Sequence, residues 1–296
     1  LSLHDALPIS SAPTIIQSAQ KTQLLAHQQQ ILKDISPISN KAAKTYLAQA
    51  RIALGKSVVD GVPTASNAWV LKGDKTIEGQ AVLYNGPQQG WYTPAITYAI
   101  GLHGAGYNLT GITPVGLPAI LFGTNGKIAW GSTVGSLDTN DVYQLTLNPS
   151  NSNEYLYKGT YIPFEHKQVK IKVKNQADHV LDVYKSKQGF VSTWDENNHT
   201  TYAQKRSWEG VEIETLLGWA NAAKASNWDE FLAQAKRVAA SITWFYADTK
   251  DNIGVAALGR LPIRPENQHI QLPAKGDGSM EWQGFYDFSH NPKEYN

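Results

Sequence analysis

The aromatic side chains of this chain begin at one point and continue to its end. All nine tryptophans lie at Trp69 or beyond, whereas residues 11–65 contain no Trp, no Phe and a single Tyr, Tyr46. Large aromatic side chains dominate the energetics of packed cores. The core must therefore be built from the sequence that starts near Ser66. A segment with so little bulk buries little surface, so we expect residues 11–65 to be a spacer or linker.

The spacer has the apolar spacing of helices. The loop SPISN separates two such segments, AQKTQLLAHQQQILKDI before it and KAAKTYLAQARIAL after it. The first segment has one apolar stripe of Leu24, Leu25, Ile31, Leu32 and Ile35. The first ten residues, LSLHDALPIS, translate back into a common sequencing-library adapter. Residues 1–10 are therefore interpreted as an assembly artefact, in which His4 and Asp5 carry no function. The alternative is an ordinary loop.

The rest of the chain reads as strands, then helices, then strands. WVLKGDKTIEGQAVLYNGP predicts two strands around a KGDK turn, and PAILFGTNGKIAWGSTVG predicts a hairpin around Thr-Asn-Gly. The alternation in QVKIKVKN predicts a half-buried strand with Val169, Ile171 and Val173 on its inward face. Its expected partner strand is HVLDVYKS. Helices are expected over Val211–Ala223 and Trp228–Ala240, and SITWFYADTKDNIGVAAL predicts a closing hairpin. This order predicts an α+β fold with mostly antiparallel sheet.

Composition argues against several classes of function. The formal net charge is +1 and the lysines are spread along the chain, so no nucleic acid or charged surface is implied as a partner. The absence of cysteine excludes disulfides, thiolate metal sites and a cysteine nucleophile. No apolar run reaches the roughly eighteen residues that span a bilayer. The eight histidines include no HxxxH pair of the kind that binds zinc.

Two glycine-rich motifs lack the spacing of functional loops. GLHGAG departs from GxGxxG and is interpreted as a tight turn, with a structural hydrogen bond for His103, and GSTVG departs from the GxSxG nucleophile elbow. The sequence SLDTNDVY is more suggestive, because Asp138, Asn140 and Asp141 bring together the hard oxygen ligands that Ca²⁺ prefers. A turn or a helix cap is the alternative for this cluster.

Ser66 has no base near it that the sequence reveals. The compositional boundary, however, falls where a cleavage would make Ser66 a new N-terminus. A free α-amino group has a reference pKa of about 7.7–8.0. It can therefore act near neutral pH as the general base for the hydroxyl of its own residue. A strand-edge serine without a catalytic role is the alternative.

Four long segments resemble the penicillin acylases: GVPTASNAWVL, NGPQQGWYTPAITYAIGLHGAGYNLTGITP, FGTNGKIAWGSTVGSLDTNDVY and NWDEFLAQAKRVAASITWFYADTKDNIG. The resemblance runs from about Gly61 to the end of the chain. It implies an N-terminal-nucleophile hydrolase with a four-layer αββα sandwich, incomplete in this chain. It also implies a periplasmic precursor that is cut before Ser66, with residues 11–65 removed as the spacer and residues 66–296 forming the N-terminal part of the β chain.

The resemblance implies roles for individual residues. Ser66 would attack an amide carbonyl and form an acyl-enzyme, Gln88 would hold the amine and the substrate, and the backbone N–H of Val134 would line the oxyanion hole. The acyl pocket would consist of Pro87, Gln89, Phe122, Ser132, Trp219 and Ile242. Core packing is the alternative for the last two. One structural Ca²⁺ per αβ heterodimer would bind Asp138, Asp141 and the backbone oxygen of Asn140. The partners would be the chain's own α chain and a small amide substrate.

The chain also departs from the family pattern. Gln89 stands where phenylacetyl-preferring members carry an aromatic residue, and Val134 stands where the family usually has Ala, a change that keeps the N–H. The family's second oxyanion donor, an Asn, would lie just beyond Asn296, and the α chain is absent. The chain is therefore interpreted as a gene fragment that is inactive alone. An acyl-homoserine lactone acylase and a non-catalytic, aromatic-rich binding module are the alternative functions.

Overall fold

The structure, a computed structural model, describes residues 58–59, 62–63, 65–88, 93–270 and 272–296. The chain divides into two compact units, Leu1–Val58 and Val59–Asn296. The helices expected within residues 11–65, the artefact expected at residues 1–10 and the pocket residue Gln89 lie outside the described residues. Within those that are described, none of the helices is long and apolar enough to cross a membrane.

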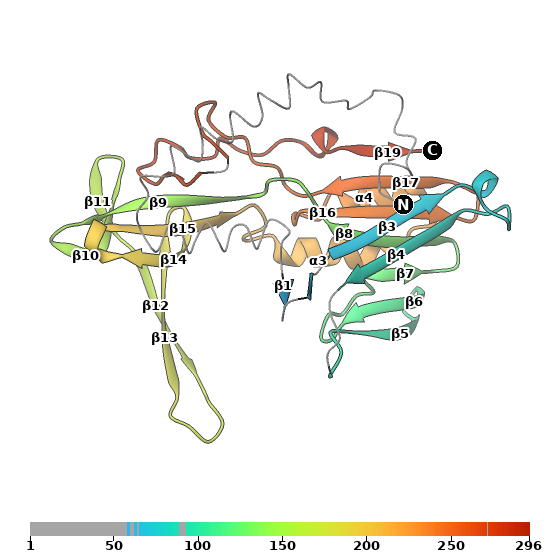
Figure 1. Cartoon of the computed structure of the whole chain (residues 1–296), viewed down its shortest axis with the longest axis horizontal. Coiled ribbons are helices and arrows are strands. Elements are labelled where there is room, and N and C mark those ends of the chain that lie inside the picture. The colour runs from blue at the N-terminus through green and yellow to red at the C-terminus, as the bar shows by residue number, and fades with distance from the viewer. Residues whose placement is uncertain (1–57, 60–61, 64, 89–92, 271) are drawn as a thin grey trace. The chain divides into compact units, whose positions relative to one another are not determined.

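Among the described residues of the second unit, seven antiparallel strands form one sheet (Figure 1). Its order is β19 (Lys293–Tyr295), β17 (Ile253–Leu258), β16 (Ile242–Asp248), β8 (Ile128–Val134), β7 (Phe122–Thr124), β6 (Tyr107–Pro114) and β5 (Thr97–Gly104). The predicted hairpin around Thr-Asn-Gly is confirmed as β7–β8, and the predicted closing hairpin in SITWFYADTKDNIGVAAL is confirmed as β16–β17. Their strands are rich in the β-branched and aromatic residues that suit a pleated, half-buried surface.

The motif GLHGAG covers the end of β5 and the two-residue turn between β5 and β6. Ala105 and Gly106 both have positive φ, 48° and 82°, as a two-residue hairpin loop requires. The ring of His103 is hydrogen-bonded through Nδ1 to Oδ1 of Asn108 at 2.7 Å. Both the tight turn and the structural role of this histidine are thus confirmed.

Two helices cover one face of the seven-stranded sheet. Helix α3 (Glu212–Ala222) agrees with its prediction within one residue at each end. Helix α4 (Trp228–Ala235) begins where the side chain of Asn227 accepts a hydrogen bond from the Glu230 N–H at 2.9 Å. It ends before the predicted Ala240: the Arg237 and Val238 N–H groups donate to carbonyls three residues back, and the Ala239 N–H donates to the hydroxyl of Thr215 at 3.1 Å.

The helices and the sheet enclose an aromatic core. Phe231 of α4 is fully buried, with its ring centroid 4.8 Å from that of Trp244 in β16 and 5.3 Å from that of Tyr246. A Cβ at Gly254 of β17 would lie 2.6 Å from the ring of Trp228, so glycine lets the helix approach the strand. Four of the nine tryptophans belong to this core: Trp130, Trp219, Trp228 and Trp244.

A two-stranded hairpin, β3 (Ala65–Leu71) and β4 (Val82–Gln88), packs on β8 and β16 from the opposite face. The 3₁₀ helix η1 (Gly73–Lys75) lies within the predicted KGDK turn between its strands. Figure 1 shows this hairpin crossing β8 and β16 on the side away from α3 and α4. The described residues therefore supply three of the expected layers, which are helices, sheet and hairpin, in an α+β arrangement.

A second sheet holds eight strands among the described residues. Its order is β11 (Thr160–Pro163), β10 (Asn151–Tyr157), β9 (Asn140–Asn148), β15 (Thr200–Arg206), β14 (Gly189–Asp195), β13 (His179–Ser186) and β12 (Glu165–Ile171), with β18 (Ala274–Lys275) parallel to β9. The remaining short elements are β1 (Val58–Val59), β2 (Val62–Pro63), η2 (Glu196–Asn198) and η3 (Phe288–His290).

The predicted pairing of QVKIKVKN with HVLDVYKS is confirmed as β12–β13. The predicted burial is wrong for Val169 and Ile171, whereas Val173, just after the end of β12, is half-buried. Val169 and Ile171 are 36% and 44% exposed, and every residue of β12 is exposed. The strands do alternate, with His166 and Asp182 on the polar face. Figure 1 shows this hairpin extending away from the other strands, so no described element covers its apolar face.

The carboxyl group of Asp248, at the turn between β16 and β17, should make the stability of the protein depend on pH in acid. Burial alone would raise the pKa of Asp248, but hydrogen bonds from Asn252, Tyr246 and the Lys250 N–H outweigh it and lower the pKa. Since the folded pKa lies below the unfolded one, the stabilisation is present above pH ~3.9 and is lost as pH falls through the folded value. We expect Asp248→Asn to reduce the slope of unfolding free energy against pH in this acid range. Chemical denaturation at several pH values measures it, and an unchanged slope would contradict the prediction.

Candidate active site

The β3–β4 hairpin brings three predicted site residues together. Ser66 is half-buried and stands directly opposite Pro87, while Gln88 is exposed and stands opposite Ala65. Directly opposed residues in an antiparallel pair lie about 4.5–5.5 Å apart at Cα. The register therefore places the proposed nucleophile beside the residue predicted to hold its amine, at the end of the hairpin where the chain enters β3.

The backbone of Val134 is oriented toward the free edge of β8. Consecutive residues of an antiparallel strand direct their N–H groups to opposite edges. The Gly135 N–H donates to Ser241 O beside β16 at 3.0 Å, whereas the Ser132 N–H donates away from β16, to the side chain of Asn85. Val134 shares the alternation of Ser132, so its N–H also points away from β16, toward the edge of β8 at which Asn85 of the hairpin bonds Ser132.

Three predicted pocket residues are contiguous through Trp244. Ser132 stands opposite Trp244, Ile242 lies two positions before it on the same face, and the ring of Trp219 meets the Trp244 ring at 5.5 Å and 66°. Trp219 is 9% exposed and its Nε1 donates to the Leu121 carbonyl at 3.3 Å. These contacts are core packing, the alternative role that the sequence left open for Trp219 and Ile242.

The fourth described wall residue comes from another strand. Phe122 begins β7 opposite Ile112 of β6 and is half-buried. Pro87, on the hairpin, lies across the sheet from the core that contains Trp219. The structure thus groups Ser132, Ile242 and Trp219 through one ring, and supplies Phe122 and Pro87 from separate elements.

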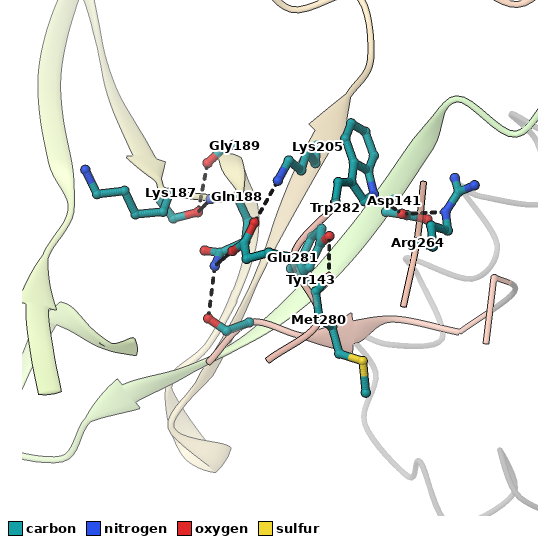
Figure 2. Close-up of polar contacts among 12 residues, drawn as sticks. Asp141, Tyr143, Lys187, Gln188, Gly189, Lys205, Arg264, Met280, Glu281 and Trp282 are labelled. Carbon is teal, nitrogen blue, oxygen red and sulfur yellow. Dashed lines mark hydrogen bonds and ion pairs between the residues drawn. The ribbon is translucent and has the colours of Figure 1, made fainter. Parts of the chain in front are cut away.

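The predicted oxygen cluster lies at the start of β9 and contains a buried ion pair. Asp141 is 5% exposed, and its Oδ2 accepts hydrogen bonds from Arg264 Nε at 2.8 Å, from Gln268 Nε2 at 2.9 Å and from Trp282 Nε1. Arg264 also donates to the backbone oxygen of Asp138 at 2.9 Å and pairs with its carboxylate at 3.2 Å. Figure 2 shows Trp282 and Arg264 converging on Asp141 from its two sides.

A polar network continues from this pair. Lys205 pairs with Glu281 at 2.8 Å and lies over the ring of Trp282, and Glu281 accepts a further bond from Gln188 at 2.7 Å (Figure 2). Tyr143 donates to the carbonyl of Met280 at 2.9 Å. The segment that carries Trp282 is therefore held at several points along β9 and β15.

The atoms of Asp138, Asn140 and Asp141 that could bind a cation are oxygens. Burial raises the pKa of Asp138, Arg264 opposes that rise and the Asp141 carboxylate adds to it. In the described residues, no group of three or more His, Cys, Asp or Glu side chains could hold a metal ion. Asn140 Oδ1 and Thr139 Oγ1, both buried, have no hydrogen-bond partner. One guanidinium against two carboxylates thus leaves the cluster with an excess of negative charge.

Sequence reasoning missed several residues at these sites. Arg264, Gln268 and Trp282 lie more than 120 positions after Asp141 in the sequence, a separation that no local motif spans. Asn85 was missed as well, although it bonds the backbone of Ser132. The only local sign of it was Gly131, whose missing side chain makes room for the Asn85 amide.

Comparisons with known proteins agree with this arrangement. The sequence model of one family, described as Penicillin amidase, matches residues 10–296. A solved structure of a thermostable penicillin G acylase from Alcaligenes faecalis superposes with a TM-score of 0.75 at 48% identity, covering 77% of this chain and 42% of that one. The fold is therefore the α+β fold of that N-terminal-nucleophile hydrolase, as expected.

Curated relatives include two kinds of acylase. Penicillin G acylase of Escherichia coli is 40% identical over 242 residues, which are 82% of this chain and 29% of that protein. Acyl-homoserine lactone acylase QuiP of Pseudomonas aeruginosa is 25% identical over 244 residues, 78% of this chain and 29% of that protein. This chain thus spans less than a third of the length of either relative. Because the family model matches nearly the whole sequence, the chain belongs to the penicillin amidase family.

Proposed function

We propose that this chain carries the nucleophile of an amidohydrolase that cleaves the side-chain amide of an acylated β-lactam or a related amide. The observation that carries the proposal is the position of Ser66. It lies opposite Pro87 on a hairpin packed against β8, and the Val134 N–H points to the edge of β8 at which Asn85 of that hairpin bonds Ser132. Membership in the penicillin amidase family supports the same reaction class.

The reaction starts after cleavage between Ala65 and Ser66 has freed the α-amino group of Ser66. That amine accepts the proton of the Ser66 hydroxyl while Oγ attacks the amide carbonyl carbon. The Val134 N–H donates to the oxyanion that forms, a contribution that is often the largest in catalysis. The C–N bond then breaks, the amine product leaves with the proton, and an acyl ester remains on Oγ. Water hydrolyses that ester and restores the hydroxyl.

The relatives support the proposed substrate class, and two kinds of acyl chain are considered. The chain is 40% identical to a penicillin G acylase and 25% to 30% identical to acyl-homoserine lactone acylases. The higher identity favours the first class, and the second is the alternative. In either case we propose that an α chain from the same precursor completes the pocket.

The test uses the whole gene product. Intact-mass analysis should find a cut between Ala65 and Ser66, and the Ser66 peptide should gain the mass of the acyl group when a turnover mixture is quenched. An active protein that stays uncut would contradict the proposal. Comparing kcat/KM for a phenylacetyl anilide and a long-chain acyl-homoserine lactone decides between the two substrate classes, with the anilide expected to be faster.

We further propose that Asp138, Asp141 and the backbone oxygen of Asn140 contribute to a structural Ca²⁺ site. The oxygen donors and the excess negative charge around Arg264 support it, since Ca²⁺ prefers carboxylate and carbonyl oxygens. When bound, the ion would supply positive charge that ties β9 to its surroundings and would take no part in the chemical step. The orphaned Asn140 Oδ1 lies on the same segment and is available as a further oxygen.

A further inference from the structure

The side chain of Asn85 joins the hairpin to the seven-stranded sheet. Its Nδ2 donates to the carbonyl of Ser132 at 3.0 Å and to the carbonyl of Asn67 at 3.2 Å, and its Oδ1 accepts the Ser132 N–H at 3.0 Å. One amide therefore bonds both backbone groups of a residue in β8 and one backbone group of β3. Ser132 is 5% exposed, so these bonds are shielded from water.

The edge of β8 needs such a partner at this position. Strand β7 pairs with β8 at Trp130 and Ala129. Because the two strands are antiparallel and the first residue of β7 is Phe122, β7 has no residue opposite Ser132. Buried backbone donors and acceptors are almost always paired. The primary amide of Asn85 has the donor and acceptor of a peptide group, and it takes the place of the missing strand neighbour.

The sequence around Ser132 makes room for this side chain. A Cβ at Gly131 would lie 2.8 Å from both Cβ and Oδ1 of Asn85, closer than real contacts allow. Glycine is thus required at Gly131 while Asn85 holds its present position. Gly131 is therefore the residue of GSTVG that accommodates Asn85, although this motif lacks the GxSxG spacing of a nucleophile elbow.

The position of the contact matters for chemistry. Asn67 directly follows Ser66, and Ser132 lies two residues before Val134 on the same edge of β8. We propose that Asn85 is a positioning residue that sets the distance between the Ser66 hydroxyl and the Val134 N–H. The inference rests on the proposed function for its catalytic consequence, while the contact itself is independent of it.

The test compares two matched asparagines in the whole protein. In Asn85→Asp, a carboxylate oxygen replaces the NH₂ group and faces two carbonyl oxygens, so the contact should open. We expect kcat for amide hydrolysis to fall about 100-fold, as a displacement near 1 Å can cause, with KM changed much less. Gly131→Ala should displace the same amide from the other side, so we expect it also to lower kcat while changing KM much less.

Asn125→Asp is the matched control. Asn125 also donates from Nδ2 to two carbonyls, those of Ala223 and Ala225 at 3.0 and 2.7 Å, and accepts two backbone N–H groups, but it ties the β7–β8 turn to the end of α3. It should lower the melting temperature at least as much as Asn85→Asp while leaving kcat near that of the wild type. Equal kcat values in the two variants would overturn the proposal.

Hydrogen exchange separates this inference from the proposed function. The Ser132 amide should exchange faster in Asn85→Leu than in the wild type, whether or not the protein hydrolyses amides. Unchanged exchange would show that the contact does not form and would overturn the inference. Faster exchange in a protein that forms no acyl-enzyme would instead reject the proposed function.

Discussion

Replacing Ser66 by Ala should abolish both maturation and turnover in the whole gene product. The substitution removes the only atom proposed to attack the amide and leaves the hairpin register with Pro87 intact. Loss of a serine nucleophile costs on the order of 10⁶-fold in kcat. Intact-mass analysis should find the bond before position 66 uncut, and burst kinetics with a chromogenic anilide should show no acyl-enzyme.

Two further variants make this result interpretable. Ser192→Ala removes the hydroxyl of a different strand serine, which donates to the Tyr202 carbonyl at 3.1 Å, and this variant should mature and turn over normally. Ser66→Cys keeps a nucleophile at this position, so it should still be cut, and the cut then frees its α-amino group. A Ser66→Ala protein with wild-type turnover would remove the basis of the proposed mechanism.

Replacing Asp141 by Asn should cause the largest loss of stability. The Asp141 carboxylate and Arg264 side chain are 4% and 11% exposed, so the guanidinium would lose most of its counter-charge in a buried position. Removing one partner of a buried ion pair costs about 3–5 kcal/mol. Urea unfolding in the presence of EDTA measures this contribution apart from calcium, and an unchanged unfolding free energy would show that the pair contributes nothing.

The same variant tests the proposed ion. Wild-type protein should gain unfolding free energy when Ca²⁺ replaces EDTA, and Asp141→Asn should lose that gain because a proposed ligand is gone. Asp74→Asn is the control: its pair with Lys75 is 64% and 68% exposed, and such surface pairs contribute about 0–1 kcal/mol. A calcium response that persists in Asp141→Asn would exclude this residue from the site.

The failed burial prediction for β12 shows a limit of periodicity. Alternation correctly assigned Val169 and Ile171 to one face of a strand and gave its partner. It could not say whether anything covers that face, because covering depends on chain segments far away in sequence. Gln89, the position that most affects the expected acyl preference, lies outside the described residues, so its role stays a prediction.

What the sequence determined by itself is local. Turn residues that need positive φ, such as Gly106, placed the hairpins correctly, because neighbouring residues alone decide them. Only the tertiary structure paired Asp141 with Arg264, 123 positions away, and Asn85 with Ser132, 47 positions away. Single polar side chains leave no periodic trace, so their partners emerge only when packing brings separate strands into contact.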